Sequence, residues 1–564
     1  MGLYKMRTEF GHQMKWLLII IAGGFLVGGL YVFTGFGGGP SMRQGGASPS
    51  DVIATVGGMD VTRGEFETAW ERELNVLTDQ QGVHSTLQQA QRRAQLFQSL
   101  IEDRVILAIA KELGVEVPDS EVRRKVDELV ATGLRDARAS AMGKMSASQE
   151  KIDPRYDREY EKVLRDAGSS VRQVEDSIRQ RISEDGIRSQ LARERIESAI
   201  RQRVGAVSAG DVADSYKVYT VRQIVIPKGT MPTDQLRARV EKIVSKARAG
   251  GDFAALAKEY SEDKGKAGPR IISFDRVLGA WMMTMRGGAQ YAPIVKSSLD
   301  IWNQVSKLKP GEVGTPMETD QAVYILKVES VTSKPPAKSD KKAQDQRKAE
   351  IEAVRVWAET LNVEQQVRKR LAIDVKDPEC RGYWELVQLG QSVTNPAQVK
   401  AALGRAKASF EKAIAQNPNN PYATTMLAMV LVQTGNSKQA LAQLAHLLES
   451  PDSRADGADL RIMFGDLLLQ SSKEYQAAKK PDKAAEAKEA AVKQYVKASD
   501  FARLDPGPHV QLIDKFKQIG RPDLVAKEKQ WMADFEAKRK AIEAERAKSG
   551  GAPMPAPRPA PVGP

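Results

Sequence analysis

An uncharged run of 21 residues near the N-terminus, Trp16–Phe36, most constrains what this 564-residue chain can form. At about 1.5 Å per residue, a helix of this length spans roughly 30 Å, the hydrocarbon thickness of a bilayer. A cleaved signal peptide has a shorter apolar core, followed by a small-residue cleavage site. Here a glycine run, Gly37–Gly39, follows instead. We therefore predict an uncleaved transmembrane anchor over residues 15–36, with a cleaved signal peptide as the alternative.

The charges before this run predict its orientation. The flank before Trp16 carries Lys5, Arg7 and Lys15 against Glu9. Because basic flanks stay on the cytoplasmic side of a membrane, we predict that residues 1–14 are a cytoplasmic N-terminus. The prediction is a single-pass protein of the inner (cytoplasmic) membrane, with everything after Phe36 in the periplasm.

The composition of the remaining chain excludes several classes of function. Charged residues make up 28% and hydrophobic residues 41% of the sequence, which suits helix-rich globular domains. The net charge of +13 is spread over segments that also carry acids, and no zinc-finger or RNA-binding motif occurs, so we predict no nucleic-acid partner. Four histidines fall in four separate regions, and no phosphate-binding loop occurs, so we predict neither a metal site nor a cofactor. The histidines are His12, His84, His446 and His509.

Residues 37–50 read as a flexible linker, because they are rich in glycine, serine and proline. The sequence then predicts a strand, a Gly-Gly turn and a helix with Thr62 as its N-cap. A long helix is expected near Thr86–Leu113, and Gly114 should end it. We expect this part of the chain to be mainly helical.

Two runs in this part carry a family resemblance. VIATVGGMDVTRGEF (Val52–Phe66) and AQLFQSLIEDRVILAIAKELGVEVPDSEVRRKV (Ala94–Val126) together resemble the N-terminal helical domain of the SurA, PpiD and PrsA family of extracytoplasmic folding factors. The resemblance implies a helical chaperone domain that is completed by a helix after an inserted isomerase domain. We therefore expect one chaperone domain built from residues 51–216 and 340–379.

Between these two pieces, residues 217–333 resemble the parvulin class of peptidyl-prolyl isomerases. Four runs carry the resemblance. They are YTVRQIVI (Tyr219–Ile226), a helical stretch over Arg237–Asp263, LKPGEVGTP (Leu308–Pro316) and AVYILKV (Ala322–Val328). The resemblance implies an α+β fold and, in the family, isomerisation of X–Pro bonds.

The positions that the family uses for catalysis differ in this chain. The parvulin family places one histidine in its first strand and one in its last, and those positions hold Gln223 and Tyr324. Asp263 matches the family's acidic or cysteine position. Since glutamine and tyrosine can also donate hydrogen bonds, two interpretations remain. The module is either degenerate and kept for packing or client contact, which we favour, or an active isomerase with a rebuilt polar network.

The family's proline pocket maps onto apolar residues. Phe274 fits the aromatic residue that ends the family's glycine turn, and counting back from Gly311 places the pocket phenylalanine on Ile301. The unusual stretch Leu278–Tyr291 puts one tryptophan and three methionines beside a Gly-Gly pair. It either offers a soft surface to apolar partners or fills the core of an enlarged loop. The candidate substrate-binding residues are Phe274, Trp281, Met282, Met283, Met285, Ile301 and Trp302.

Residues 397–548 carry a repeated pattern. The apolar spacing of Ala406, Phe410 and Ala413 recurs in character 34 residues later. This period resembles the tetratricopeptide family, in which stacked helix pairs bury a continuous core. The resemblance implies an α-solenoid that docks a protein partner. Residues 549–564 contain six prolines and are predicted to be a disordered tail.

Taken together, the sequence predicts a mainly α protein with a transmembrane anchor, a split helical chaperone domain, an inserted α+β parvulin-like domain and a C-terminal α-solenoid. The predicted function is a membrane-anchored folding chaperone that holds unfolded or newly exported polypeptides and docks a partner through its repeats. One alternative is an active peptidyl-prolyl isomerase of the same architecture. The other is a scaffold subunit of an envelope assembly complex, in which the repeats provide the essential binding.

Overall fold

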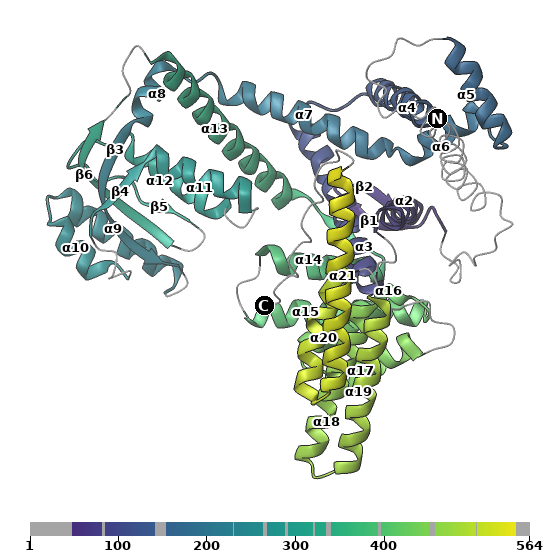
Figure 1. Ribbon diagram of the computed structural model, residues 1–564. Coiled ribbons are helices and arrows are strands. Elements are labelled where there is room, and N and C mark those ends of the chain that lie inside the picture. The colour runs from purple at the N-terminus through teal and green to yellow at the C-terminus, as the bar shows by residue number, and fades with distance from the viewer. Residues whose placement is uncertain are drawn as a thin grey trace. The chain divides into compact units, whose positions relative to one another are not determined.

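The computed structural model of the chain (Figure 1) describes most of the sequence after the predicted anchor. The described residues are 48–81, 85–141, 154–228, 231–262, 268–287, 292–319, 322–333, 335, 340–392, 396–449, 457–502 and 505–548. The predicted anchor and the predicted proline-rich tail lie outside them. Among the described helices, none has the length and apolar character needed to cross a membrane.

The chain divides into two compact units. The first contains the chain up to Ala108, the segment Val117–Gln190 and the chain from Leu371 onward. The second contains Ile109–Glu116 and Leu191–Arg370. The first unit therefore combines N-terminal helices with the C-terminal repeats, and the second contains the parvulin-like segment.

A small antiparallel sheet with the order β2-β1-β7 opens the first unit. Its strands are β1 (Val52–Val56), β2 (Met59–Thr62) and β7 (Ile373–Val375). The turn between β1 and β2 consists of Gly57 and Gly58, whose φ angles of +57° and +82° are those that a tight two-residue hairpin needs. Strand β7 comes from far along the chain, and it pairs with β1.

Helices from the N-terminal part follow this sheet. They are α2 (Arg63–Gln81), α3 (Thr86–Glu112), α4 (Asp119–Ala141), α5 (Pro154–Asp166), α6 (Val171–Arg181) and α7 (Glu184–Val204). The backbone N–H of Glu65 donates to Thr62 Oγ1 at 3.2 Å, so Thr62 satisfies one of the free donors at the start of α2. Gly114 takes a φ of +68° just after α3, a conformation that favours glycine at a helix end.

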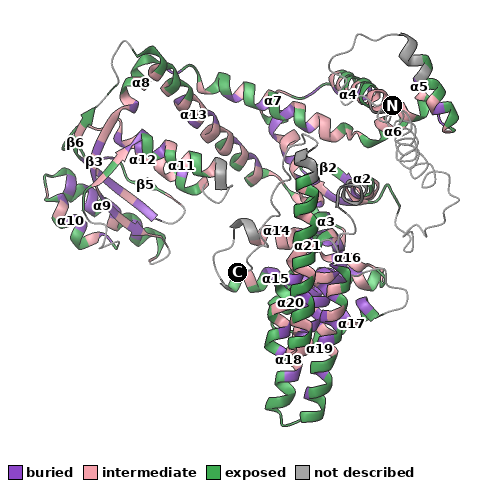
Figure 2. Cartoon of the chain, in the orientation of Figure 1, coloured by how far each residue is buried: buried purple, intermediate pink, exposed green. Residues whose placement is uncertain are grey.

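From Pro378 to Lys548 the described chain is helical. The helices are α14 (Pro378–Ser392), α15 (Pro396–Gln416), α16 (Pro421–Gln433), α17 (Ser437–Glu449), α18 (Ala458–Ala477), α19 (Pro481–Phe501), α20 (Pro506–Ile519) and α21 (Pro522–Lys548). Consecutive helices pack as pairs. The helices carry both buried and exposed residues (Figure 2). In the α18–α19 pair, a Cβ atom added to Gly465 would lie 2.4 Å from the Tyr495 ring, so only glycine permits this close approach.

The second unit is built on a four-stranded antiparallel sheet with the order β4-β3-β6-β5. Its strands are β3 (Lys217–Pro227), β4 (Arg270–Ser273), β5 (Met317–Glu318) and β6 (Ala322–Ser333). Its helices after α7 are α8 (Ala209–Ser215), α9 (Thr233–Arg248), α10 (Phe253–Tyr260), α11 (Phe274–Gly287), α12 (Ala292–Val305) and α13 (Lys341–Arg370).

The two faces of this sheet are covered by different helices. Ile224 and Ile325 point to the face that packs on α9 and α10. Tyr219 and Leu326 point to the other face, where Val305 of α12 is buried against them. Since side chains alternate along a strand, β3 and β6 each contribute to both cores.

Candidate functional site

The two positions that replace the family histidines lie on neighbouring strands of the second unit. In the β3–β6 register, Gln223 is opposite Leu326, and Val225 is opposite Tyr324. Residues directly opposite each other, and residues two apart on one strand, share a face. Gln223 and Tyr324 are therefore diagonal neighbours on the α12 face of the sheet. The Gln223 side chain is only 4% exposed, and Tyr324 packs at the edge of the cluster around Val305.

Asp263, the third candidate catalytic residue, lies outside the described residues. The chain just before it is fixed to β3. The buried hydroxyl of Ser261 accepts a hydrogen bond from Val225 N at 3.2 Å, and Glu262 N donates to Val225 O at 3.1 Å. Sequence reasoning missed Ser261, although its place two residues before the acidic position Asp263 was a signal. Its bonds hold the α10 end beside the strand that carries Gln223.

Two of the predicted pocket residues form the core of a helical layer. Phe274 is 1% exposed and Trp302 is 6% exposed, and their rings meet edge to face with centroids 5.3 Å apart. Ile351 and Val354 of α13 are buried in the same cluster. The helix that follows the parvulin-like segment thus covers the aromatic surface of α11 and α12. With these exposures, neither the Phe274 ring nor the Trp302 ring is open to a proline ring in this structure.

An arginine on α13 holds this helix against the aromatic residues. Arg347 lies over the rings of Tyr216 and Phe274, at 4.8 Å and 5.6 Å from their centroids, and it pairs with Asp275 at 2.7 Å. Cation–aromatic contacts of this kind are worth about 0.5–2 kcal/mol, the more the drier they are. Sequence analysis did not identify Arg347, because its partners lie some 70 residues or more earlier in the chain.

A second ion pair joins α13 to α8. Arg355 donates to Asp211 at 2.6 Å, and Asp211 also bonds to the backbone and hydroxyl of Ser208 as part of a helix capping box. The hydrogen bond from Arg355 is the main cause that holds the pKa of Asp211 well below its usual range. The carboxylate is therefore charged at neutral pH and available to hold α13.

The remaining candidates lie on α11 and α12. Met282 and Met283 are 43% and 60% exposed, whereas Trp281 is partly buried against the Phe274 cluster. Ile301 is partly buried in the cluster that includes Leu326, on the sheet side of α12. Met285 lies on α11, and its side chain is outside the described part. The structure therefore separates these residues into a buried group and an exposed methionine pair.

Within the described residues, no group of histidine, cysteine, aspartate and glutamate side chains is arranged to hold a metal ion. The second unit instead offers apolar contacts and hydrogen-bonding groups. These are the elements with which a protein binds or positions polypeptide chains.

Family models match three parts of the chain. A SurA-like N-terminal domain matches residues 3–188, a PPIC-type peptidyl-prolyl isomerase domain matches residues 216–345, and a tetratricopeptide repeat matches residues 401–462. The last two matches cover the parvulin-like sheet and helices α15 to α17 with the start of α18.

Curated relatives are similar over about half of this chain. A chaperone SurA from Polaromonas sp. (strain JS666) is 26% identical over 285 residues, which cover 49% of this chain and 52% of the relative. A foldase protein PrsA from Geobacillus kaustophilus is 26% identical over 266 residues, 46% of this chain and 82% of the relative. The chain thus spans about half the length of the SurA relative that it matches.

Solved structures with detectable similarity include PrsA from Bacillus cereus, at 18% identity and a TM-score of 0.19, covering 64% of this chain and 99% of that one. A SurA-like chaperone of Campylobacter jejuni aligns at 10% identity with a TM-score of 0.20, covering 57% of this chain and 98% of that one. From the family matches and the curated relatives together, the chain carries a SurA-like N-terminal domain, a PPIC-type peptidyl-prolyl isomerase domain and a tetratricopeptide repeat, and its homologues are SurA and PrsA chaperones.

Proposed function

We propose that this protein is a membrane-anchored, extracytoplasmic folding chaperone that holds unfolded or newly exported polypeptides, and that its isomerase-type domain binds or positions chains without catalysis. The repeats would dock a protein partner. The observation that carries the proposal is the burial of Phe274 and Trp302 under α13, in a chain whose N-terminal part is SurA-like.

Three further facts support the proposal. The positions of the two family histidines hold Gln223 and Tyr324, which share a sheet face but lack imidazole chemistry. The exposed methionines Met282 and Met283 offer soft apolar contact area to varied partners. The uncharged run Trp16–Phe36 is long enough to anchor the chain in a membrane.

Holding activity is the first test. The chain from residue 48 onward should suppress aggregation of a chemically unfolded protein at a near-stoichiometric ratio, because apolar contacts form one complex per client and no turnover is involved. Light scattering during dilution from denaturant measures this. Suppression should weaken several-fold in Met282→Gln/Met283→Gln, since two partly exposed apolar side chains contribute roughly 1 kcal/mol each when a client buries them.

The matched control is Lys296→Gln/Asp300→Gln on the neighbouring helix α12, an exposed pair joined by a 2.9 Å salt bridge. This variant should protect the client as well as the unchanged chain. If neither the unchanged chain nor any variant suppresses aggregation, the scaffold alternative would replace the chaperone proposal.

Topology is the second prediction. A reporter enzyme that works only outside the cytoplasm, fused after Pro564, should be active in cells, and the mature protein should keep its original N-terminus. Both results follow from an uncleaved anchor with a cytoplasmic basic flank. N-terminal sequencing of the mature protein checks the second result. A soluble product that begins near residue 40 would show a cleaved signal peptide and would remove the anchor from the proposal.

A further inference from the structure

One face of α3 contacts the repeats at three points. Ser85, which caps this helix, Gln89 and Arg93 are four residues apart, so they lie in one line along α3. Their hydrogen-bond partners are, in order, Asp459 of α18 at 2.6 Å, Tyr422 of α16 at 3.3 Å and Glu379 of α14 at 2.7 Å. The Ser85 hydroxyl and Arg93 Nε donate, whereas the Gln89 side-chain oxygen accepts.

The three partners occupy the same place in the repeats. The helices α14, α16 and α18 are the first members of consecutive pairs, and each partner is the second residue of its helix. A Cβ atom added to Gly457, the residue before α18, would lie 2.3 Å from the Cβ of Ser85, so a larger residue does not fit there. The start of α3 therefore lies tightly against the first turns of three successive pairs.

The line on α3 changes character after Arg93. Its next members, Phe97 and Ile101, are buried, and Phe97 packs edge to face on Phe66 of α2 with ring centroids 5.9 Å apart. The apolar part of the line thus serves the core of the N-terminal helices. The polar part serves the contact with the repeats.

Polar contacts of this kind make the surface selective. Glu379 is buried, so a helix without an arginine at this place would leave its carboxylate without a cation. The Arg93 guanidinium also lies over the Tyr422 ring, 5.2 Å from its centroid. Because an unsuitable helix is penalised, the surface distinguishes α3 from apolar helices in general.

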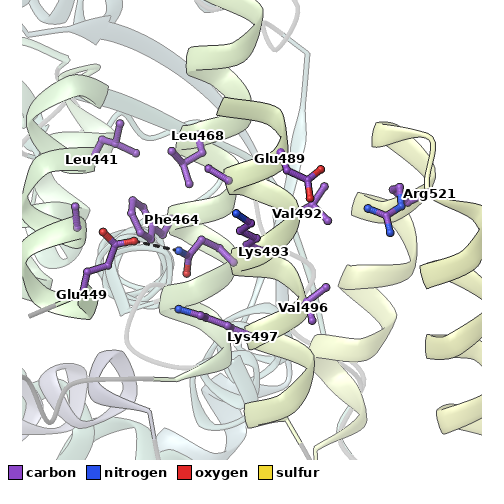
Figure 3. A pocket seen from close by; sticks show the side chains of 13 residues that line it. Leu441, Glu449, Phe464, Leu468, Glu489, Val492, Lys493, Val496, Lys497 and Arg521 are labelled. Carbon is purple, nitrogen blue, oxygen red and sulfur yellow. Dashed lines mark hydrogen bonds between the residues drawn. The ribbon is translucent and has the colours of Figure 1, made fainter. Parts of the chain in front are cut away.

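The second helices of the pairs present a different surface. Leu441 of α17 and Val496 of α19 line a pocket of about 740 Å³, which residues of α18 complete (Figure 3). The charged residues that line this pocket are Glu449, Glu489, Lys493, Lys497 and Arg521. Because both signs are present, the pocket favours neither an anion nor a cation, in contrast to the contact of Glu379 with Arg93.

We propose that the first turns of α14, α16 and α18 form a recognition surface for α3, and that this internal ligand closes the surface to other proteins. The helix that fits carries a hydroxyl, an amide and a guanidinium at four-residue intervals. A separate partner of the repeats has to dock on another surface. The inference goes beyond the proposed function, which names no surface of the repeats.

The test is the binding of a fluorescein-labelled peptide of residues 85–112, measured by fluorescence anisotropy with the full chain and its variants. In the unchanged chain, the covalently attached α3 competes at a high effective concentration. The peptide should therefore bind Arg93→Met, whose own α3 is weakened, with a Kd at least about 10-fold lower than that for the unchanged chain. The matched control is Arg92→Met, which changes the exposed neighbour on the same helix and should behave as the unchanged chain.

The peptide has its own matched pair. A peptide in which Arg93 is replaced by methionine should bind Arg93→Met at least about 10-fold more weakly than the native peptide, because it brings no cation to Glu379. A peptide in which Arg92 is replaced by methionine should bind as the native peptide does.

Hydrogen exchange shows whether the variant chain stays folded. In Arg93→Met, the first turns of α14, α16 and α18 should lose protection, while α17 and α19 keep theirs. If α17 and α19 lose protection too, the milder variant Gln89→Ala replaces it. This variant removes only the acceptor for Tyr422, and the peptide should bind it several-fold more tightly than the unchanged chain.

Two results would overturn the inference. One is equal binding of the native peptide to the unchanged chain and to the folded variant. The other is equal binding of the peptides with and without Arg93, which would show unselective apolar adhesion. Since client holding is assigned to Met282 and Met283 of the second unit, either result would leave the chaperone proposal standing.

Discussion

Replacing Arg93 by methionine should lower the free energy of unfolding of the first unit by about 3–5 kcal/mol, the usual cost of breaking a buried ion pair from one side. The Arg93 side chain is buried on α3, and its Nε donates to Glu379 of α14 at 2.7 Å. Its two terminal nitrogens donate to Glu67 of α2 at 3.0 and 2.6 Å. The methionine variant would leave the buried Glu379 without its cation.

This cluster joins the N-terminal helices to the repeats. Besides Arg93, Glu379 accepts hydrogen bonds from Tyr383 and from Asn420, each at 2.7 Å. Asn420 is also the N-cap of α16, the helix that opens the next pair. One carboxylate therefore ties together three parts of the chain, and we expect repeats and N-terminal helices to unfold together.

The matched control is Arg92→Met. Arg92 is the exposed neighbour on the same helix and bonds only to Gln95, at 3.3 Å, among the described contacts. We expect its effect to stay within about 0.5 kcal/mol. Urea denaturation followed by tryptophan fluorescence measures the stability of both variants. Trp70 of α2 packs edge to face on Tyr422 of α16, so it lies at the contact between the N-terminal helices and the repeats. Equal stabilities of the two variants would show that the cluster does not hold the unit together.

The same cluster makes the stability of the first unit depend on pH. Burial alone would raise the pKa of Glu379. The charge of Arg93 and the hydrogen bonds from Arg93, Tyr383 and Asn420 outweigh burial, so the pKa is lowered. A lowered folded pKa means that the unfolded state binds the proton more readily. The contribution of Glu379 is therefore complete above the unfolded value of about 4.3 and is lost as the pH falls through the folded value. In Arg93→Met this acid-dependent part should shrink, as denaturation at pH 7 and at about pH 3 would show.

Replacing Trp302 by alanine should destabilise the second unit by about 3–5 kcal/mol, the range for deleting a large buried aromatic side chain. Trp302 packs on Phe274 and lies in one cluster with Ile351 and Val354 of α13. An open proline pocket would leave this ring largely in water, and its removal would then cost little.

Hydrogen exchange of the α13 amides, followed by mass spectrometry, measures this local stability. Protection of α13 should fall by two orders of magnitude or more in Trp302→Ala, since each factor of ten corresponds to about 1.4 kcal/mol. Met283→Ala, which removes an exposed side chain of the same layer, should leave α13 protection nearly unchanged. Unchanged protection in Trp302→Ala would mean that α13 does not seal this surface.

Much of the local structure could be predicted from the sequence. The Gly57-Gly58 turn and the Thr62 cap follow from the conformations and hydrogen bonds that these residue types favour. The helical repeats follow from the apolar period near Phe410. These features depend on residues close together in the chain.

The stretch Leu278–Tyr291 shows why other parts were harder to predict. Its glycines suggested a loop, but α11 continues to Gly287. Tertiary packing stabilises the helix in this stretch. Phe274, Val277 and Trp281 lie on one side of α11 and pack in the cluster that contains Ile351 and Val354 of α13. The exposed Met282 and Met283 lie on the same helix, so they do not fill a core.

The two arginine clusters could not have been found from spacing alone. Arg93 and Glu379 are 286 residues apart, and Arg347 and Asp275 are 72 apart. The one local signal was an arginine at position 93, one turn before the apolar Phe97 on the buried side of α3. A buried arginine needs a carboxylate, but the sequence does not say which one.

The most direct test of the central claim, that the isomerase-type domain does not catalyse isomerisation, is exchange NMR on a proline-containing peptide. Uncatalysed cis–trans exchange takes tens of seconds at 25 °C, so even weak catalysis is visible. The chain from residue 48 onward is added at a fiftieth of the peptide concentration, and we expect the exchange rate to stay at its uncatalysed value. The double variant Gln223→His/Tyr324→His should not raise this rate, because α13 still covers Phe274 and Trp302. Clear catalysis that disappears in Tyr324→Phe but persists in Tyr260→Phe, a change on the opposite face of the sheet, would contradict the account and establish an active isomerase.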